Sequence, residues 1–401
     1  MPDHVPIVHE PLVNHEGFHE GERPPADGIG LCLSGGGYRA MLFHVGTLWR
    51  LNELGLLSRI DRISSVSGGS ITAGALGVGW KDFSWNQDKT QVTAASFREH
   101  FVEPVRRLAR QTIDLAAIGW GILSPFSSIG DQIADAYDET LFHGATLADL
   151  PDDWSASVPR SGGPRLVINA TNVQTGSLWR FSKPYMADYR VGLAPQPTIA
   201  LSQAVAASSA FPPFLSPVKL NLSGVVFKQG IPAGPVDSPL RREAVLTDGG
   251  VYDNLGLEPI WKRYRTVLVS DAGRRMQDDL SPATDWARHS RRLIDLLQSQ
   301  ISSLRRKQVV QSYRQGERLG AYWGIQTDIA KFQLPSALDC PYEKTRAIAA
   351  IDTRLAAMSE RDQERLINWG YAVCDAAVRR HVAEYQAAAR PAGFPHPATG
   401  L

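Results

Sequence analysis

Three short sites in this chain combine a serine, an acid and runs of glycine in a way that suits acyl transfer. Ser67 is followed directly by two glycines, and so is Asp248. A third glycine run, from Gly35 to Gly37, precedes both. A serine hydroxyl attacks an ester carbonyl, an acid accepts its proton, and backbone N–H groups stabilise the oxyanion. We therefore interpret the three sites as one catalytic set.

The first glycine run lies where a strand is expected to turn into a helix. Residues 30–34 are short, apolar and alternating, which predicts a strand, and apolar spacings of three and four over 40–56 predict a buried helix. Glycines at such a turn adopt positive φ, and their N–H groups next to a helix N-terminus favour an anion. We expect the glycines at 35–37 to form an oxyanion hole, with Arg39 holding the loop or the charge.

Other interpretations of the loop are a tight turn without chemistry and a nucleotide site. The dinucleotide pattern Gly-x-Gly-x-x-Gly does not fit, because Gly28 and Gly30 are followed by Leu33. A P-loop does not fit either, because no Gly-Lys-Ser/Thr follows the glycines. The plain turn stays open when this loop is taken alone.

Ser67 lies at the centre of a predicted strand–turn–helix. We expect a strand over 60–66 and a helix of small residues from 70 to 76. This order matches a nucleophile elbow, whose usual pattern is Gly-x-Ser-x-Gly and whose sharp turn holds the serine exposed and strained. Ser65 replaces the first glycine and Gly69 keeps the second. Serine is small enough for that position, so the elbow is our interpretation, with a Ser/Gly-rich loop as the alternative.

Asp248 ends a short apolar stretch over 244–247 that predicts a strand, and Gly249 and Gly250 follow it. Strand ends are where α/β enzymes place catalytic groups. Asp-Gly is also a common turn signal, so this site alone supports a turn as well as a base. The order of the three sites and their flanking elements favour the catalytic set.

At these residues the chain resembles the patatin-like phospholipase family. The resemblance covers a glycine-rich oxyanion loop ending in arginine, a serine elbow and an Asp-Gly-Gly turn, here Gly35, Gly36, Gly37, Arg39, Ser67 and Asp248. Blocks at 168–176 and 204–212 are similar to a strand and an Ala/Ser-rich helix of that family. The match spans about 29–275, and the missing first glycine of the elbow is the visible departure.

The resemblance implies an α/β, three-layer patatin-like fold with a mainly parallel central sheet flanked by helices, plus C-terminal helices. It implies a lipid acyl hydrolase, phospholipase A-like or lysophospholipase-like, that works through an acyl-enzyme and a Ser67–Asp248 dyad without histidine. The substrate would be a phospholipid or another lipid ester, with no cofactor and no metal. Free aspartate has a pKa of about 3.9, so a site that uses Asp248 as base must be partly desolvated or couple proton transfer to attack.

Two other functions stay open. An α/β-hydrolase esterase with a Ser-Asp-His triad needs a late histidine, for which His289, His381 and His396 are the candidates. A non-catalytic lipid-binding or scaffold protein would keep the fold without the chemistry. The intact serine, acid and glycine loop argue against that second alternative.

The remaining sequence predicts a catalytic core with appendages. We expect a flexible N-terminal arm over 1–27, the core over 28–275, a helical extension packed on it over 276–390, and a tail over 391–401. Apolar periodicity predicts long amphipathic helices over 286–315 and 366–385, and a hairpin excursion is expected over 217–243. Two segments are candidates for membrane contact, the apolar stretch 113–126 and the arginine-rich helix near 288–307.

Composition limits the class of partner. A net charge of +1 argues against bulk electrostatic attraction to nucleic acid or acidic membranes, and 43% hydrophobic residues suffice for one large core or two modest ones. The widely spaced Cys32, Cys340 and Cys374 indicate neither a disulfide framework nor a zinc site. The first 25 residues lack the apolar region of a secretory signal. We expect a cytoplasmic protein, with peripheral membrane association left open and the oligomeric state unassigned.

Overall fold

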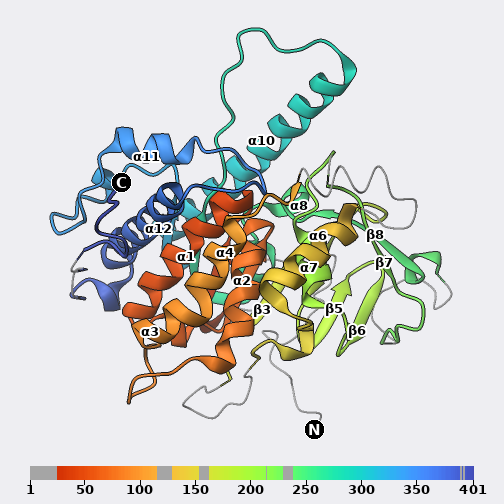
Figure 1. Cartoon of the computed structure of the whole chain (residues 1–401), viewed down its shortest axis with the longest axis horizontal. Coiled ribbons are helices and arrows are strands. Elements are labelled where there is room, and N and C mark those ends of the chain that lie inside the picture. Colours follow the sequence, from red (N-terminus) through yellow and green to blue (C-terminus); the bar gives the residue numbers. More distant parts are fainter. Residues whose placement is uncertain are drawn as a thin grey trace.

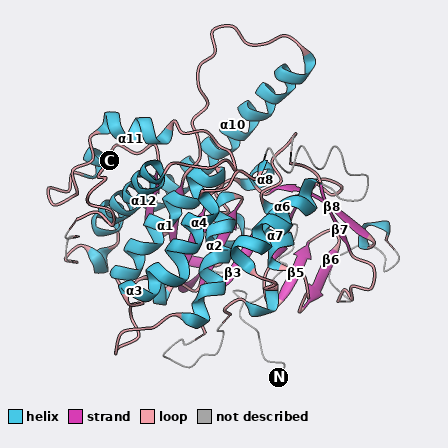
Figure 2. Cartoon of the chain, viewed as in Figure 1, coloured by secondary structure: helices cyan, strands magenta, loops and turns pink. Residues whose placement is uncertain are grey.

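The computed structural model describes residues 25–114, 129–152, 162–213, 215–228, 238–388, 391 and 393–401. Its strands are β1 (Ala26–Leu33), β2 (Arg62–Val66), β3 (Arg165–Asn172), β4 (Ser177–Phe181), β5 (Tyr185–Asp188), β6 (Gly192–Pro195), β7 (Val218–Asn221), β8 (Glu243–Asp248), β9 (Tyr264–Asp271) and β10 (Leu319–Gly324). They form one sheet in the order β10-β9-β1-β2-β3-β4-β5-β6, with β8 also paired to β3 and β7 to β8. Parallel pairing joins β10, β9, β1, β2 and β3 in that order, and the pairs formed by β4 to β8 are antiparallel. Figure 2 shows β5 and β6 side by side, away from α12.

The described helices are α1 (Gly37–Glu53), α2 (Gly68–Gly79), α3 (Ala94–Phe97), α4 (Glu103–Ala109), α6 (Ile129–Tyr137), α7 (Leu201–Ser208), α8 (Gly250–Asp253), α9 (Glu258–Trp261), α10 (Trp286–Gln315), α11 (Tyr342–Ala349) and α12 (Glu360–His381). Helices α1, α2, α4 and α12 gather on one side of the sheet (Figure 1). Helix α9 instead contacts β9, β1 and β2, and helix α10 contacts β10.

The central strands are buried on both faces, because successive side chains of a strand point to opposite sides. Leu31 and Leu33 of β1 belong to the core under α1 and α12. Cys32, between them, packs with Ile260 of α9 and Val309 of α10 in a second apolar cluster. The chain therefore has three layers, helices on each side of a sheet, and the predicted fold class is confirmed.

Helices α1 and α12 approach each other closely because glycines face the contact. A Cβ atom on Gly46 would lie 1.9 Å from the carbonyl oxygen of Ile367, and one on Gly370 would lie 1.9 Å from that of Phe43. No side chain fits at either position. Elements far apart in sequence are thereby packed backbone to backbone, and α12 covers the helix that follows the first glycine run.

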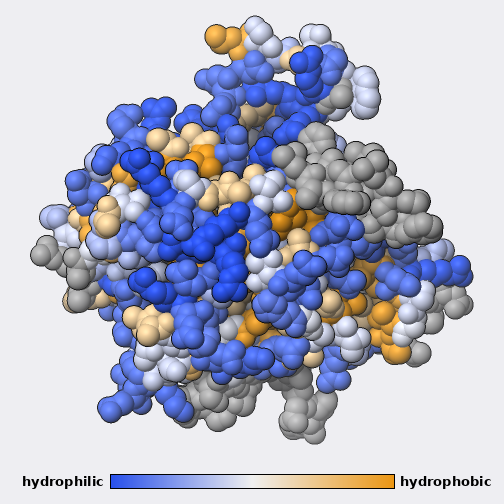
Figure 3. All heavy atoms as spheres, viewed as in Figure 1, coloured by the Kyte–Doolittle hydropathy of each residue, from blue (hydrophilic) through white to orange (hydrophobic). Residues whose placement is uncertain are grey.

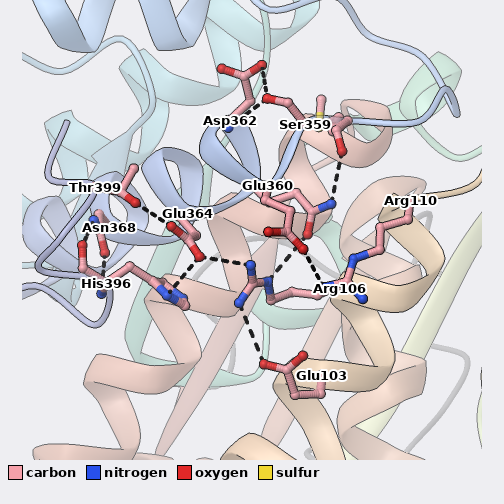
Figure 4. Close-up of polar contacts among 12 residues, drawn as sticks. Glu103, Arg106, Arg110, Ser359, Glu360, Asp362, Glu364, Asn368, His396 and Thr399 are labelled. Carbon is pink, nitrogen blue, oxygen red and sulfur yellow. Dashed lines mark hydrogen bonds and ion pairs between the residues drawn. The ribbon is translucent and has the colours of Figure 1, made fainter.

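The last residues of the chain pack against α12 and α4 through a polar network (Figure 4). The side chain of Asn368 donates to the carbonyl oxygens of His396 and Gly400 at 2.9 and 2.8 Å, and accepts from the N–H of His396 at 2.9 Å. Glu364 pairs with Arg106 at 2.9 Å and accepts from the hydroxyl of Thr399. The segment expected as a tail thus lies against α12 in its described part.

Several predicted elements can be compared with the structure. The predicted helix over 286–315 is confirmed at both ends by α10, whereas α12 begins at Glu360 because the Ser359 hydroxyl caps it by accepting from the N–H of Asp362 at 3.1 Å. The predicted hairpin is confirmed in its described part, where β7 pairs with β8. Residues 1–24 of the predicted arm, and the apolar segment 113–126 beyond Asp114, lie outside the described residues.

No helix in the described ranges has the length and apolar character needed to cross a bilayer.

The close approach of α1 and α12 yields a stability prediction. Gly370→Ala should lower the urea midpoint of unfolding, because overpacking against the Phe43 carbonyl costs about 1–3 kcal/mol. That loss should exceed the roughly 1 kcal/mol that alanine gains over glycine inside a helix. Gly393→Ala is the matched control, since a Cβ atom there meets nothing within 4 Å. Equal midpoints for the two variants would contradict the close contact.

Candidate active site

Ser67 lies in a sharp turn between β2 and α2. Its backbone has φ 52° and ψ −122°, a conformation that a non-glycine residue adopts only under constraint. The N–H of Ser67 donates to the hydroxyl of Ser208 at 2.9 Å, and its carbonyl accepts from the N–H groups of Ser70 and Ile71 at 2.8 and 3.1 Å. The strained turn is therefore fixed from both sides, as a nucleophile elbow requires.

The glycines after Ser67 are required by close packing against the first glycine loop. A Cβ atom on Gly69 would lie 2.4 Å from the carbonyl oxygen of Leu33, and one on Gly68 would lie 2.1 Å from that of Gly37. Real Cβ atoms do not come so near to backbone atoms. The second glycine of the elbow pattern thus lets the serine turn lie directly on the end of β1.

A buried set of hydroxyl groups supports the elbow from behind. The hydroxyl of Ser70 donates to that of Ser65 at 3.0 Å and lies 2.9 Å from that of Ser208. Ser208 in turn donates to the carbonyl oxygen of Asn169 at 2.6 Å. Ser65, which replaces the usual glycine, is fully buried and hydrogen-bonded, so the departure from the pattern is accommodated. Ser208 was not predicted, and the Ala/Ser-rich block around it was its only signal.

The sheet brings Asp248 to the serine. Strand β2 pairs with the first half of β3 and ends with Val66 opposite Asn169. Strand β8 runs the other way along the same edge of β3 and ends with Asp248 opposite Ala170. The carboxyl ends of β2 and β8 therefore meet on β3, although about 180 residues separate Ser67 from Asp248 in sequence.

Asp248 is 2% exposed and its carboxylate is hydrogen-bonded. It accepts from the N–H of Gly250 at 2.7 Å, and the hydroxyl of Ser67 lies next to it. Burial raises the pKa of Asp248 to about 6, although the hydrogen bond from Gly250 and the neighbouring Ser67 hydroxyl oppose that rise. Asp248 is thus desolvated, as expected for an aspartate that acts as a base. Its raised pKa suits it to accept a proton near neutrality.

Each glycine of the Asp-Gly-Gly turn has its own close neighbour. A Cβ atom on Gly249 would lie 2.3 Å from the carbonyl oxygen of Asn169, and one on Gly250 would lie 2.5 Å from the side-chain oxygen of Asn254. The same Asn254 oxygen would lie 2.4 Å from a Cβ atom on Gly35. Asn254 therefore lies between the acid turn and the first glycine loop.

In the first glycine loop, Gly36 and Gly37 have φ values of 146° and 59°, which glycine adopts without strain. The N–H of Gly35 donates to the carbonyl oxygen of Asn254 at 3.1 Å, and that of Tyr38 donates to the carbonyl of Arg354 at 3.0 Å. Between them, the N–H groups of Gly36 and Gly37 have no acceptor among the described residues. These two donors beside Ser67 are available to a ligand.

Arg39 supports this loop from within the protein. Its fully buried guanidinium donates to the carbonyl oxygens of Ile351 at 2.6 Å and Ala272 at 3.0 Å. Burial and, to a lesser extent, the nearby Arg274 lower the pKa of Arg39 to about 10, so the guanidinium is still charged at neutrality. Arg39 thus ties the loop to the end of β9 and to a segment before α12.

That segment, residues 351–355, completes the back of the loop. The carbonyl oxygen of Arg354 accepts from the N–H of Tyr38. The Arg354 guanidinium forms a bidentate ion pair with Asp114 at 2.9 and 3.2 Å. The N–H of Ile113 donates to the carbonyl of Leu355 at 2.8 Å. Residues well outside the region of family resemblance therefore help to shape the glycine loop, and no local pattern indicated them.

A cavity of about 730 Å³ joins the three predicted sites. Its lining includes Ser67, Asp248, Gly250, Arg39 and all three glycines of the first loop, whereas Ser65, Gly69 and Gly249 support it from behind. Phe211, Leu215 and Met276 supply apolar surface, and arginines of the β9–α10 loop and of α10 supply positive charge. This size and mixture suit a small-molecule substrate with an apolar and a polar part.

The histidines considered for a triad lie elsewhere. His289 is exposed on α10, His381 packs against the ring of Phe332, and His396 packs against that of Trp49. The described lining of the cavity contains no histidine. No group of side chains suited to a metal ion is found in the described ranges either.

Comparison with known proteins adds a family match. Residues 31–261 match the sequence profile of the family described as patatin-like phospholipase, whereas no curated protein sequence matches the chain. Human GIVD cytosolic phospholipase A2 has a similar fold, with a TM-score of 0.50 and 13% identity over 86% of this chain and 58% of that one. VipD from Legionella pneumophila gives a TM-score of 0.34 and 14% identity over 88% of this chain and 66% of that one.

The hydroxyl set behind the elbow yields a second prediction. Ser208→Ala should slow the modification of Ser67 by a fluorophosphonate roughly tenfold, because the buried Ser67 N–H loses its acceptor. The measurement is the rate of covalent labelling, followed by mass spectrometry. Ser202→Ala, a buried serine on the same helix, is the control and should label at the unaltered rate. Unchanged labelling of both variants would show that Ser208 does not position the serine.

Proposed function

This chain belongs to the patatin-like phospholipase family, and from that membership we propose that it is a lipid acyl hydrolase whose catalytic groups are Ser67 and Asp248. The observation that carries the proposal is the meeting of Ser67 and a buried aspartate with a raised pKa in one cavity. A carboxylate with a pKa of about 6 accepts a proton far more readily than an ordinary aspartate. The strained backbone of Ser67 and the open N–H groups of Gly36 and Gly37 support the same reaction.

In the first half of the reaction, the Ser67 oxygen attacks the carbonyl carbon of an ester and its proton passes to Asp248. The carbonyl oxygen becomes an oxyanion, which accepts hydrogen bonds from the N–H groups of Gly36 and Gly37. When the intermediate collapses, the alcohol leaves with the proton from Asp248. The acyl group remains on Ser67.

In the second half, water replaces the alcohol. Asp248 accepts a proton from the water as its oxygen attacks the acyl carbon, and the same two N–H groups stabilise the second oxyanion. The fatty acid leaves as the proton returns to the oxygen of Ser67. One buried acid therefore serves both halves, and no histidine takes part.

The remaining predicted site residues take positioning roles in this proposal. Gly35 donates its N–H to Asn254 and so holds the loop, and Arg39 holds it through two carbonyl groups rather than by contact with the oxyanion. Ser65 and Gly69 keep the elbow, and the glycines at 249–250 keep the acid turn.

The cavity supports a lipid ester as the substrate. Its apolar side chains offer room for an acyl chain next to Ser67, and its arginines offer partners for a phosphate or another anionic group. A triad esterase is disfavoured because the described lining of the cavity supplies no histidine. A scaffold without catalysis is disfavoured because a strained serine backbone and a desolvated acid with a raised pKa are features of catalytic sites, and a binding surface does not need them.

Removing either catalytic group should abolish hydrolysis. Ser67→Ala and Asp248→Asn should each lower kcat/KM by at least roughly a thousandfold, because each removes a group that acts only in the reaction. The measurement is fatty acid release from mixed phospholipid vesicles and from a series of short-chain to long-chain esters. Exposed Ser223→Ala and Asp278→Asn are the matched controls. An Asp248→Asn protein with full activity would exclude the dyad.

The pH profile should report on Asp248. The base must be ionised, so kcat/KM on a soluble ester should rise with pH and reach half of its plateau near pH 6, the pKa of the buried carboxyl. Histidines titrate in the same range, so the profile should be repeated with His381→Ala and His396→Ala, which we expect to leave the midpoint unchanged. A midpoint near pH 4, or one that moves in a histidine variant, would speak against Asp248.

A further inference from the structure

Helix α10 is attached to the body of the protein mainly through its C-terminal half. Val309 is fully buried, and the hydroxyl of Tyr313 donates to the carbonyl oxygen of Val267 at 2.6 Å. Arg305 pairs with Glu258 at 3.2 Å. The first turns of α10, with the loop that precedes them, project beyond the body at the top of Figure 1. A projecting helix of this kind needs a physical reason, because its surface is not covered by the other described residues.

One face of α10 is apolar and exposed to solvent. Trp286 is 84% exposed, and Leu297 and Leu304 are each 63% exposed. Leu293 is also exposed, and spacings of seven and four place these four residues on one side of the helix. Leu280, in the loop before the helix, is 99% exposed. An amphipathic helix normally turns such a face toward the core, and here it faces outward.

The opposite face of α10 is polar and lines the catalytic cavity. Arg291, Asp295, Gln298, Ser302 and Arg306 all belong to the cavity lining, and spacings of four and three place them along one side. At about 100° per residue, this side lies across the helix axis from the exposed leucines. The visible side of the projection in Figure 3 is mainly hydrophilic, with a hydrophobic group at its outer end.

Charge identifies the surface that the exposed face suits. The helix carries seven basic side chains and a single acidic one, Asp295, whereas the whole chain has a net charge of only +1. The basic ones are Arg288, Arg291, Arg292, Arg305, Arg306, Lys307 and Arg314. A second copy would bring the same excess of positive charge to the contact, which disfavours self-association through α10. An anionic lipid surface complements both the charge and the apolar face.

We propose that α10 is a membrane-docking helix, which inserts its exposed apolar face into the boundary between headgroups and acyl chains of an anionic bilayer. Lys307 lies one turn from Leu304, so it reaches the phosphate level when the leucine is inserted. The combination of Trp and Leu on one face with arginine on the other is that of helices that lie in the plane of the membrane interface.

Docking through α10 also sets the position of the cavity. Because the polar face of the same helix forms a wall of that cavity, the cavity lies beside the lipid surface when α10 is inserted. A lipid ester then moves from the bilayer to Ser67 along one helix. This consequence rests on the proposed function, whereas the docking itself depends only on the surface of α10.

The test measures membrane binding separately from hydrolysis. Binding is followed by flotation of the full chain carrying Ser67→Ala, with vesicles of equal parts phosphatidylcholine and phosphatidylglycerol and with vesicles of phosphatidylcholine alone. We expect the mixed vesicles to bind more tightly and added salt to weaken that binding. Adding Leu297→Asn and Leu304→Asn should weaken binding to the mixed vesicles by at least about tenfold. Val226→Asn is the control, because Val226 is an exposed apolar residue away from α10.

Hydrolysis is measured separately, in protein that retains Ser67, and it distinguishes the docking proposal from the proposed function. The double leucine variant should cleave a soluble short-chain ester at the unaltered rate, since neither leucine lines the cavity, and should lose activity on mixed vesicles. Undiminished vesicle binding by that variant, or equal binding to both vesicle types, would overturn the docking proposal. So would a dimer in sedimentation that the variant dissociates, because the leucines would then join two copies. Absence of ester hydrolysis in every form would overturn the proposed function and leave the flotation result to decide the docking.

Discussion

The active site depends on how closely two backbone turns approach each other. The turn after β1 and the turn after β2 lie so near that a single Cβ atom on Gly68 would meet the carbonyl oxygen of Gly37 at 2.1 Å. This contact sets the distance between the serine and the N–H groups of the first loop. Strand β8 pairs antiparallel with the edge of β3 and ends beside these two turns, which places Asp248 next to them. A further parallel strand could not end at this point, because β2 already pairs with the first half of the same edge of β3.

Burial gives the acid its chemistry. Asp248 accepts a hydrogen bond from the N–H of Gly250 and lies beside the Ser67 hydroxyl, and both favour ionisation, but it is so deeply buried that desolvation outweighs them and its pKa rises to about 6. The same buried region holds the hydroxyl groups of Ser65, Ser70 and Ser208, each with a partner. A polar interior of this kind is stable only when its groups are satisfied, and here they also fix the nucleophile.

Local patterns in the sequence predicted the local parts of the site. Strand, glycine turn and helix around Ser67, and the ends of α10, follow from periodicity and from residues with special backbone freedom. Contacts made across hundreds of residues were not predictable in that way. Arg39 was expected to hold the loop or the charge, but no local pattern indicated its partners, the carbonyls of Ala272 and Ile351. Periodicity likewise predicted an apolar stripe on α10 but not its orientation, since a stripe has the same pattern whether it faces a core or solvent.

The support of the glycine loop by residues 351–355 has a consequence for synthesis of the protein. The glycines, the serine and the acid all leave the ribosome well before Ile351 and Arg354, whose carbonyl groups hold Arg39 and Tyr38 in place. Until that segment emerges, the loop lacks these two hydrogen bonds and the buried guanidinium has only one of its two carbonyl acceptors. The nascent chain therefore carries the three predicted sites before it carries the segment that supports the glycine loop. If the proposed function holds, hydrolysis therefore requires residues 351–355 to have been synthesised, and not only the three sites that precede them.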